Sequence, residues 1–151
     1  MGKKAVRVFL DSNVIISGLL SEKGAPRIIL DILSLRLPQI LGMTGKYNLL
    51  ETEKTLSRKL PEVLPIYKKY LSKINLKIIP LPSKKEIGPF CDLISEKDAP
   101  VLASAVMGHA DFLVTGDKKD FMKLRKGNLP FANVTPSEFI SQIVEKIIAE
   151  R

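Results

Sequence analysis

The chain has 151 residues, 45% of them hydrophobic and 26% charged, which suits one compact domain spanning residues 1–151. Lys and Arg outnumber Asp and Glu by 24 to 16, and the formal charge of +8 attracts polyanions, although Lys-rich surfaces also serve solubility. The single cysteine excludes an intrachain disulfide and a thiolate zinc site, and without a signal peptide or an apolar run of ~20 residues we expect a cytoplasmic protein with no membrane span.

Predicted strands alternate with predicted helices along the chain. Strands are predicted where short apolar runs are bounded by turn residues, and helices where apolar residues recur every three or four positions. The strands cover residues 6–10, 39–41, 76–81, 112–115 and 131–134, and the helices cover 25–35, a segment capped by Thr44, and 62–74. This alternation is typical of an α/β protein whose parallel sheet is covered by helices on both faces.

The last predicted helix begins at a capping box. Thr135 takes the N-cap position, Pro136 the first helical position, where a missing N–H does no harm, and Glu138 the third. Phe139 and Ile143 then follow on one face of the helix, which we expect to be buried.

Acidic residues stand at positions where the ends of parallel strands are expected. Asp11 directly follows the first strand, and Asp117 follows the strand at 112–115. Parallel neighbours end at the same edge of a sheet, and ligands bind beyond that edge. Asp98 begins a later apolar helix, and Glu51 lies in the helix after the second strand. We therefore expect these acids to gather at one edge.

Each acid also has a purely structural interpretation. Asp98 could be an ordinary N-cap, while Asp117 and Asp120 could belong to a Gly-Asp turn followed by a cap. Glu51 and Glu53 could both face solvent. The positions considered together favour a functional site over these separate interpretations.

Acids that gather in this way need their charges compensated. At an effective dielectric constant of about 20, two carboxylates ~5 Å apart repel each other by roughly 3 kcal/mol, which is large against a net stability of ~5–15 kcal/mol. Either some acids hold protons with a raised pKa, or cations lie between them. A set of oxygen ligands with neither Cys nor His favours Mg²⁺ or Mn²⁺ over Zn²⁺.

Four stretches of the chain resemble the PIN domain family, especially its VapC-type toxins. They are "VFLDSNVIISG", "LLETEKTLSRKL", "DAPVLASAVMGHADFLVTGDKKDF" and "TPSEFI", in the family's order and approximate spacing. The resemblance implies a three-layer α/β/α sandwich with a central parallel sheet of about five strands. It also implies a Mg²⁺- or Mn²⁺-dependent ribonuclease that leaves a 5′-phosphate and a 3′-hydroxyl on its RNA, often as a homodimer and as the toxin of a toxin-antitoxin pair.

The resemblance also assigns roles to individual residues. The acids that it implies for catalysis and metal binding are Asp11, Glu51, Asp98 and Asp117, with Asp120 as an additional metal-binding acid. The polar residues that it implies for orienting these acids are Asn13 and Thr115. Ser12 stands where the family usually has Thr, and it retains the hydroxyl group.

The choice between Glu51 and Glu53 depends on which argument is used. A helical wheel places Glu53 among Leu49, Leu56 and Leu60, with Glu51 on another side. The spacing of the family's motif selects Glu51 instead. The spacing is the better guide, because a wheel has to assume where the sheet lies.

Two other functions stay open from the sequence. A haloacid-dehalogenase-like phosphatase also ends its first strand in a nucleophilic Asp, here Asp11, but it has a second Asp two positions later. Asn13 stands there in this chain, and an amide cannot donate a carboxyl proton. The other alternative is a nonenzymatic RNA-binding module, against which the retained acids argue. The RNA target and the presence of an antitoxin, which depends on a neighbouring gene, cannot be told from this sequence.

Overall fold

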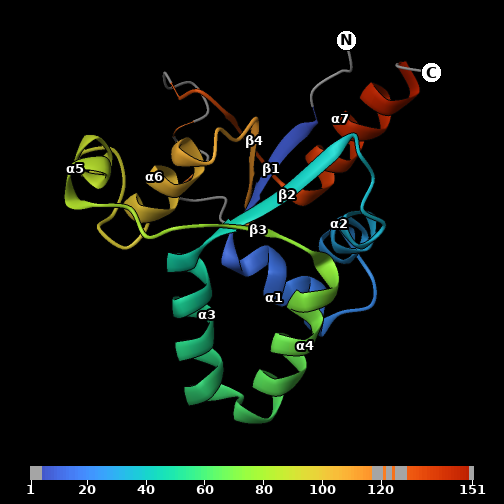
Figure 1. Ribbon diagram of the computed structural model, residues 1–151, viewed down its shortest axis with the longest axis horizontal. Helices are drawn as coiled ribbons and strands as arrows, with labels where there is room; N and C mark the ends of the chain where they lie inside the picture. The colour runs from blue at the N-terminus through green and yellow to red at the C-terminus, as the bar shows by residue number, and fades with distance from the viewer. Residues whose placement is uncertain (1–4, 117–120, 122–123, 125–128, 150–151) are drawn as a thin grey trace.

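A five-stranded parallel sheet forms the centre of the protein (Figure 1). The computed structural model describes residues 5–116, 121, 124 and 129–149. The strands lie in the order β3-β2-β1-β4-β5, and every neighbouring pair is parallel. Their bounds are β1 Val6–Leu10, β2 Ile40–Gly45, β3 Lys77–Ile79, β4 Phe112–Val114 and β5 Ala132–Val134. The predicted parallel sheet is confirmed.

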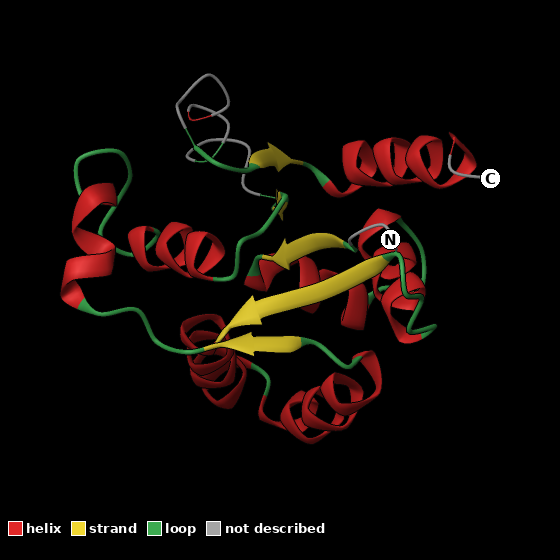
Figure 2. Ribbon diagram, turned by 45° about the horizontal axis from the view of Figure 1, so that its top comes forward, coloured by secondary structure: helices red, strands yellow, loops and turns green. Residues whose placement is uncertain are grey.

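Helices lie on both sides of this sheet (Figure 2). They are α1 Ser12–Leu20, α2 Ala25–Ser34, α3 Lys46–Lys59, α4 Leu64–Ile74, α5 Lys84–Ile87, α6 Ala99–Met107 and α7 Pro136–Ala149, with 3₁₀ turns η1 Pro61–Val63 and η2 Gly88–Phe90. In Figure 1, α2 and α6 lie on opposite sides of β1 and β2. Within the described ranges, no helix is long and apolar enough to cross a bilayer.

Two apolar cores, one on each face of the sheet, hold the layers together. Successive residues of a strand point to opposite faces, so Val8 and Leu10 of β1 enter one core and Phe9 enters the other. Side chains of α1, α2, α4 and α7 complete the first core, and side chains of α6 complete the second. The predicted three-layer α/β/α sandwich is confirmed.

The order of the strands along the chain reverses beside β1. From β1 the chain adds β2 and then β3 on one side, and later places β4 on the other side of β1. In such sheets, ligands bind beyond the carboxyl ends of the strands at this switch point. Asp11, the residue after β1, is located there, and its N–H donates a 3.0 Å hydrogen bond to the carbonyl of Val114 in β4.

Two local features differ from the prediction. Helix α1 begins directly after β1, where the sequence pattern alone does not predict a helix, and the Asp11 side chain caps it by accepting from the N–H of Ser12. Thr44, predicted to cap the next helix, instead lies in β2, and its hydroxyl donates a 2.8 Å hydrogen bond to the carbonyl of Leu10. The N-cap of α3 is therefore Gly45.

The capping box predicted at the start of α7 is confirmed. The N–H of Thr135 donates to Glu138 Oε1 at 2.8 Å, and the N–H of Glu138 donates to Thr135 Oγ1 at 3.2 Å. Phe139 and Ile143, farther along the helix, are buried in the first core. The capping box fixes the start of α7, and its apolar face packs against the sheet.

Candidate active site

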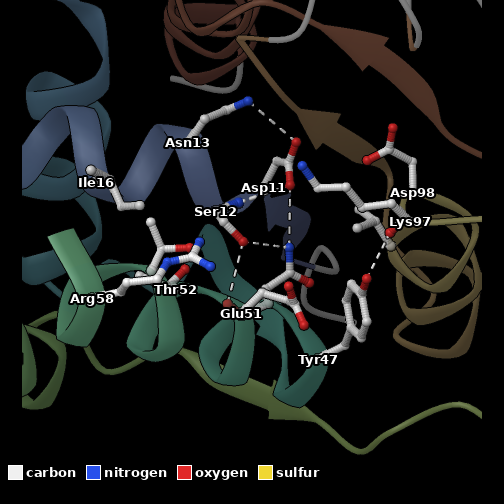
Figure 3. A pocket seen from close by; sticks show the side chains of 13 residues that line it. Asp11, Ser12, Asn13, Ile16, Tyr47, Glu51, Thr52, Arg58, Lys97 and Asp98 are labelled. Carbon is white, nitrogen blue, oxygen red and sulfur yellow. Dashed lines mark hydrogen bonds between the residues drawn. The ribbon is translucent and has the colours of Figure 1, made fainter. Parts of the chain in front are cut away.

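A pocket of about 340 Å³ opens beyond the carboxyl end of β1. Among the described residues, three carboxylates line it, those of Asp11, Glu51 and Asp98. They come from three separate segments, because Asp11 follows β1, Glu51 lies in α3 and Asp98 directly precedes α6. Figure 3 shows these segments around the pocket. The structure thus brings together three of the four acids for which the sequence predicts catalytic roles.

Hydrogen bonds from four of the described residues fix the carboxylate of Asp11, which is only 8% exposed. Its Oδ1 accepts from the N–H of Ser12 at 2.8 Å and from Asn48 Nδ2 at 3.2 Å. Its Oδ2 accepts from Thr115 Oγ1 at 2.9 Å and, more weakly, from Asn13 Nδ2 at 3.5 Å. The donors come from α1, α3 and the end of β4, so the carboxylate is held in one orientation by much of the fold.

Asn48 is a site residue that the sequence analysis did not find. It is 1% exposed, and its Nδ2 donates to Ser12 Oγ at 2.9 Å as well as to Asp11. Its Oδ1 has no hydrogen-bond partner among the described residues, and a β-carbon added at Gly45 would lie 2.8 Å from it. Glycine at position 45 therefore leaves room for this amide. The signal in the sequence is a polar residue one helical turn before Glu51.

Glu51 lines the pocket, whereas the charge of Glu53 acts on a tyrosine of α4. The buried stripe of α3 consists of Asn48, Thr52 and Leu56. Glu51 lies beside this stripe on the side of the pocket. Glu53 lies on the other side, where its negative charge helps to raise the pKa of Tyr67 in α4. The helical wheel pointed to Glu53 because it centred the buried face on leucines, while the buried face actually contains two polar residues.

Asp98 stands at the N-cap position of α6 without capping the helix. Its side chain makes no capping hydrogen bond, and Ser95 Oγ donates to Asp98 Oδ2 at 3.0 Å. An ordinary N-cap would instead accept from the backbone of the following turn. The interpretation of Asp98 as a simple helix cap is therefore wrong, and its carboxylate remains on the pocket wall.

Tyr47 lies within the electrostatic field of all three carboxylates. Burial is the largest cause that raises the pKa of its phenol above the ordinary value of 10.0. The negative charges of Glu51, Asp98 and Asp11 raise this pKa further, in that order. The Tyr47 hydroxyl donates a 2.8 Å hydrogen bond to the carbonyl of Lys97 and so ties α3 to the loop that carries Asp98.

Two cationic residues also line the pocket. Lys97 comes from the loop before α6, and Arg58 lies on α3, two turns after Glu51. In Figure 3, the Lys97 side chain extends toward Asp11, and Arg58 lies toward the opposite end of the pocket. The described lining of the pocket therefore carries two positive charges beside its carboxylates.

Two of the acids predicted for the site, Asp117 and Asp120, lie outside the described residues. Asn13 contacts the last described residue before them, because its Oδ1 accepts from the N–H of Gly116 at 3.0 Å. In the part of the chain that the structure describes, no three acidic, His or Cys side chains are already grouped at the spacing of metal ligands. Asp11, Glu51 and Asp98 line one pocket, but their carboxylates are not close enough together to bind one metal ion in this arrangement.

Comparison with known proteins gives a family match and several similar folds. The sequence profile of the family described as PIN domain matches residues 7–119. No curated protein sequence matches the chain significantly.

Among solved structures, PAE2754 from Pyrobaculum aerophilum has a TM-score of 0.65 at 14% identity, over 95% of this chain and 94% of that one. VapBC2 from Rickettsia felis, bound to a DNA fragment from its promoter, has a TM-score of 0.64 at 16% identity, over 86% and 98% of the two chains. FitAcB from Neisseria gonorrhoeae has a TM-score of 0.62 at 17% identity, over 85% and 97%. At these identities the likeness concerns the fold.

Proposed function

The chain belongs to the PIN domain family, and from this premise we propose that it is a nuclease that uses a divalent metal ion to hydrolyse RNA. The pocket at the carboxyl end of β1 is its active site. The reaction adds water across a phosphodiester bond and leaves a 5′-phosphate and a 3′-hydroxyl.

The presence of Asp11, Glu51 and Asp98 around one pocket supports this proposal most strongly. Three carboxylates from separate segments repel one another, and a fold that keeps them together without a function loses stability. A divalent cation bound between the carboxylates would attract each of them and so offset their mutual repulsion. The hydrogen bonds to Asp11 keep one of the three groups in place before any cation arrives.

The donor groups fit Mg²⁺ or Mn²⁺. The carboxylates of the described lining residues supply hard oxygen ligands, and neither His nor Cys is among these residues. When bound, such an ion activates a water molecule and neutralises charge on the leaving oxygen. The residues proposed to hold it are Asp11, Glu51, Asp98 and Asp117, with Asp120 as an additional ligand. Ser12, Asn13 and Thr115 support Asp11 through hydrogen bonds to it or to its neighbours.

RNA is the proposed substrate because the pocket joins acids with cations. Lys97 and Arg58 line the pocket together with the carboxylates and can contact phosphates next to the one that is cleaved. The formal charge of +8 on the whole chain attracts a polyanion that the acids alone would repel.

An antitoxin and a second copy of this chain are the proposed protein partners. The similar structures include VapBC2 from Rickettsia felis and FitAcB from Neisseria gonorrhoeae. By analogy, we propose that this chain is the toxin of a toxin-antitoxin pair and that it forms a homodimer. Light scattering of the purified chain, alone and coexpressed with the product of the neighbouring gene, measures both associations.

The phosphatase alternative gains no support from Asn13. In a haloacid-dehalogenase-like phosphatase, the residue at this position is an Asp that donates a proton. Here both ends of the amide hold the site together, since Nδ2 donates to Asp11 and Oδ1 accepts from Gly116. Detection of an aspartyl-phosphate on Asp11 would restore this alternative.

An RNA cleavage assay of the native chain and of Asp11→Asn, with Mn²⁺ and with EDTA, tests the proposal. Asparagine keeps the shape and the capping acceptor of Asp11 but removes its charge, so we expect cleavage to fall at least about 100-fold. Asp31→Asn, which removes an exposed carboxylate on α2, is the matched control and should cleave normally. Undiminished cleavage by Asp11→Asn, or by the native chain in EDTA, would refute the proposed active site. Equal binding of RNA in EDTA and in Mn²⁺, without cleavage products, would support the nonenzymatic alternative.

A further inference from the structure

A second cavity adjoins the carboxylate pocket and shares two residues with it. It has a volume of about 750 Å³ and lies between α3, α5 and the start of α6. Tyr47 and Lys97 line both cavities. Because the Tyr47 hydroxyl is bonded to the carbonyl of Lys97, these two residues form a fixed boundary between the cavities. A ligand long enough to extend beyond the carboxylate pocket on this side would therefore reach the second cavity.

The walls of the second cavity combine positive charge with apolar and aromatic surface. Among its described lining residues, Lys84 of α5 supplies a positive charge and Glu96 a carboxylate, while Lys97 lies at the boundary with its side chain extended toward Asp11 in the carboxylate pocket. Neither lysine forms an ion pair with another described residue. Ile87 and Pro100 contribute apolar surface, and Tyr47 contributes an aromatic ring. Single-stranded nucleic acids bind where cations accompany the backbone and aromatic rings contact the bases.

Lys84 is the first residue of α5, and a capping box fixes the backbone around it. Ser83 and Glu86 form a capping box, in which the N–H of Ser83 donates to Glu86 Oε1 at 2.9 Å and the N–H of Glu86 donates to Ser83 Oγ at 3.2 Å. The Glu86 carboxylate is thus bonded to Ser83 at the first turn of α5. Glu86 therefore does not pair with Lys84, and the positive charge of Lys84 can attract a phosphate of a bound ligand.

We propose that this second cavity binds the nucleotide next to the scissile phosphate of a single-stranded RNA. Lys84 and Lys97 contact its phosphates, and the base lies against Tyr47, Ile87 and Pro100. The proposal rests on the nuclease function proposed above, because it takes the carboxylate pocket as the site of cleavage. A volume of about 750 Å³ lies within the range of cavities that hold small ligands, about 300–1,000 Å³.

The only cysteine of the chain reports directly on this cavity. Cys91 is exposed and lines its wall. The test uses the Asp11→Asn protein, so that RNA is bound without being cut, and measures the rate at which a maleimide modifies Cys91. We expect a short single-stranded RNA to slow this modification in a saturable manner. A free nucleoside monophosphate at the same phosphate concentration should have a weaker effect, because it lacks the contacts in the carboxylate pocket.

Removal of one lysine provides the second arm of the test. In the Asp11→Asn background, Lys84→Gln should weaken RNA binding about three- to tenfold. The slope of the logarithm of the binding constant against the logarithm of the salt concentration should become shallower by about one, as expected for the loss of one phosphate contact. Lys68→Gln, on the exposed face of α4, removes the same charge outside this cavity and should have little effect. The dissociation constant is measured by fluorescence anisotropy at several salt concentrations.

The outcomes separate this inference from the nuclease function. If the native chain cleaves RNA but saturating RNA leaves the modification of Cys91 unchanged, the second cavity is not a nucleotide site, while the nuclease proposal stands. Equal RNA affinities of Lys84→Gln and Lys68→Gln would also overturn the inference. Protection of Cys91 together with no cleavage by the native chain would support a nucleotide site in this cavity and refute the nuclease.

Discussion

Thr115 and Asp11 lie 104 positions apart in the chain, yet Thr115 Oγ1 donates a 2.9 Å hydrogen bond to Asp11 Oδ2. The pairing of β1 with β4 brings them together, since Leu10 and Val114, the residues before them, are register partners. This contact joins the two strands at the switch point of the sheet. It makes the position of Asp11 a property of the whole fold rather than of the loop after β1.

Thr115→Val should separate the positioning of Asp11 from the stability of the sheet. Valine keeps the shape of threonine but removes the donor, so Asp11 Oδ2 loses its 2.9 Å hydrogen bond and is held less firmly. We expect a loss of about 1 kcal/mol in the free energy of unfolding and a fall of about tenfold in the affinity for Mn²⁺. Calorimetric titration with Mn²⁺ measures the affinity, and Thr115→Ser should restore it. Equal Mn²⁺ affinities for valine and threonine at this position would contradict a positioning role.

Some of these features were predictable from the sequence because they depend on local patterns. The capping box of α7 follows from Thr135 and Glu138, and the strand β1 follows from an apolar run that ends at Asp11. The position of Asp11 at an edge of the sheet then follows from the parallel arrangement of the strands.

Other features depend on contacts that a single sequence does not reveal. Strand β2 extends to Gly45 although it contains Gly42, where a β-carbon would lie 2.7 Å from Leu33 Cδ1. Close packing against α2 therefore requires glycine at this position, a residue that weakens strands and is uncommon in them. Asn48 was missed for a related reason, since its role depends on a hydrogen bond to a residue 37 positions earlier.

Asn48→Asp should convert a support of Asp11 into a source of repulsion. Asn48 Nδ2 lies 3.2 Å from Asp11 Oδ1, so an ionised carboxylate there would oppose Asp11 by about 5 kcal/mol at an effective dielectric constant of about 20. We expect a large drop in melting temperature at neutral pH. The drop should shrink at acidic pH, where one carboxyl of the pair is protonated, and on addition of Mn²⁺.

Asn48→Ala provides the control for that experiment. It removes the same hydrogen bonds without adding charge, so its loss of stability should depend much less on pH and on Mn²⁺. Thermal unfolding followed by circular dichroism compares the two variants. Identical pH dependence in both would show that Asn48 and Asp11 do not interact electrostatically.

Glu51→Gln and Glu53→Gln should affect two different tyrosines. Glu51 is the carboxylate that raises the pKa of Tyr47 most, and Glu53 is the one that raises the pKa of Tyr67. We therefore expect Glu51→Gln to lower the pKa of Tyr47 only, and Glu53→Gln to lower that of Tyr67 only. The chain has three tyrosines and no tryptophan, so ultraviolet difference spectroscopy resolves their titration. The reverse assignment would place Glu53 at the pocket and remove Glu51 from the site.

Tyr67→Phe should make the protein more resistant to alkali. Burial raises the pKa of Tyr67 from its ordinary value of 10.0 to about 12, with the Thr52 hydroxyl opposing the rise and Glu53 adding to it. As pH rises above 10.0, the unfolded chain loses this proton before the folded chain does. The stability that the protonated phenol contributes is therefore present below pH 10.0 and is lost progressively toward about pH 12.

Phenylalanine has no proton to lose, so the free energy of unfolding of Tyr67→Phe should fall less steeply over this interval than that of the native chain. Urea titrations across the range measure the two slopes. Tyr70→Phe is the control, because burial also raises the pKa of Tyr70, while the positive charge of Arg27 lowers it. It should leave more of the native slope in place than Tyr67→Phe does. If Tyr67→Phe and the native chain lose stability in parallel, the phenol of Tyr67 ionises equally easily in both states and is not buried as described.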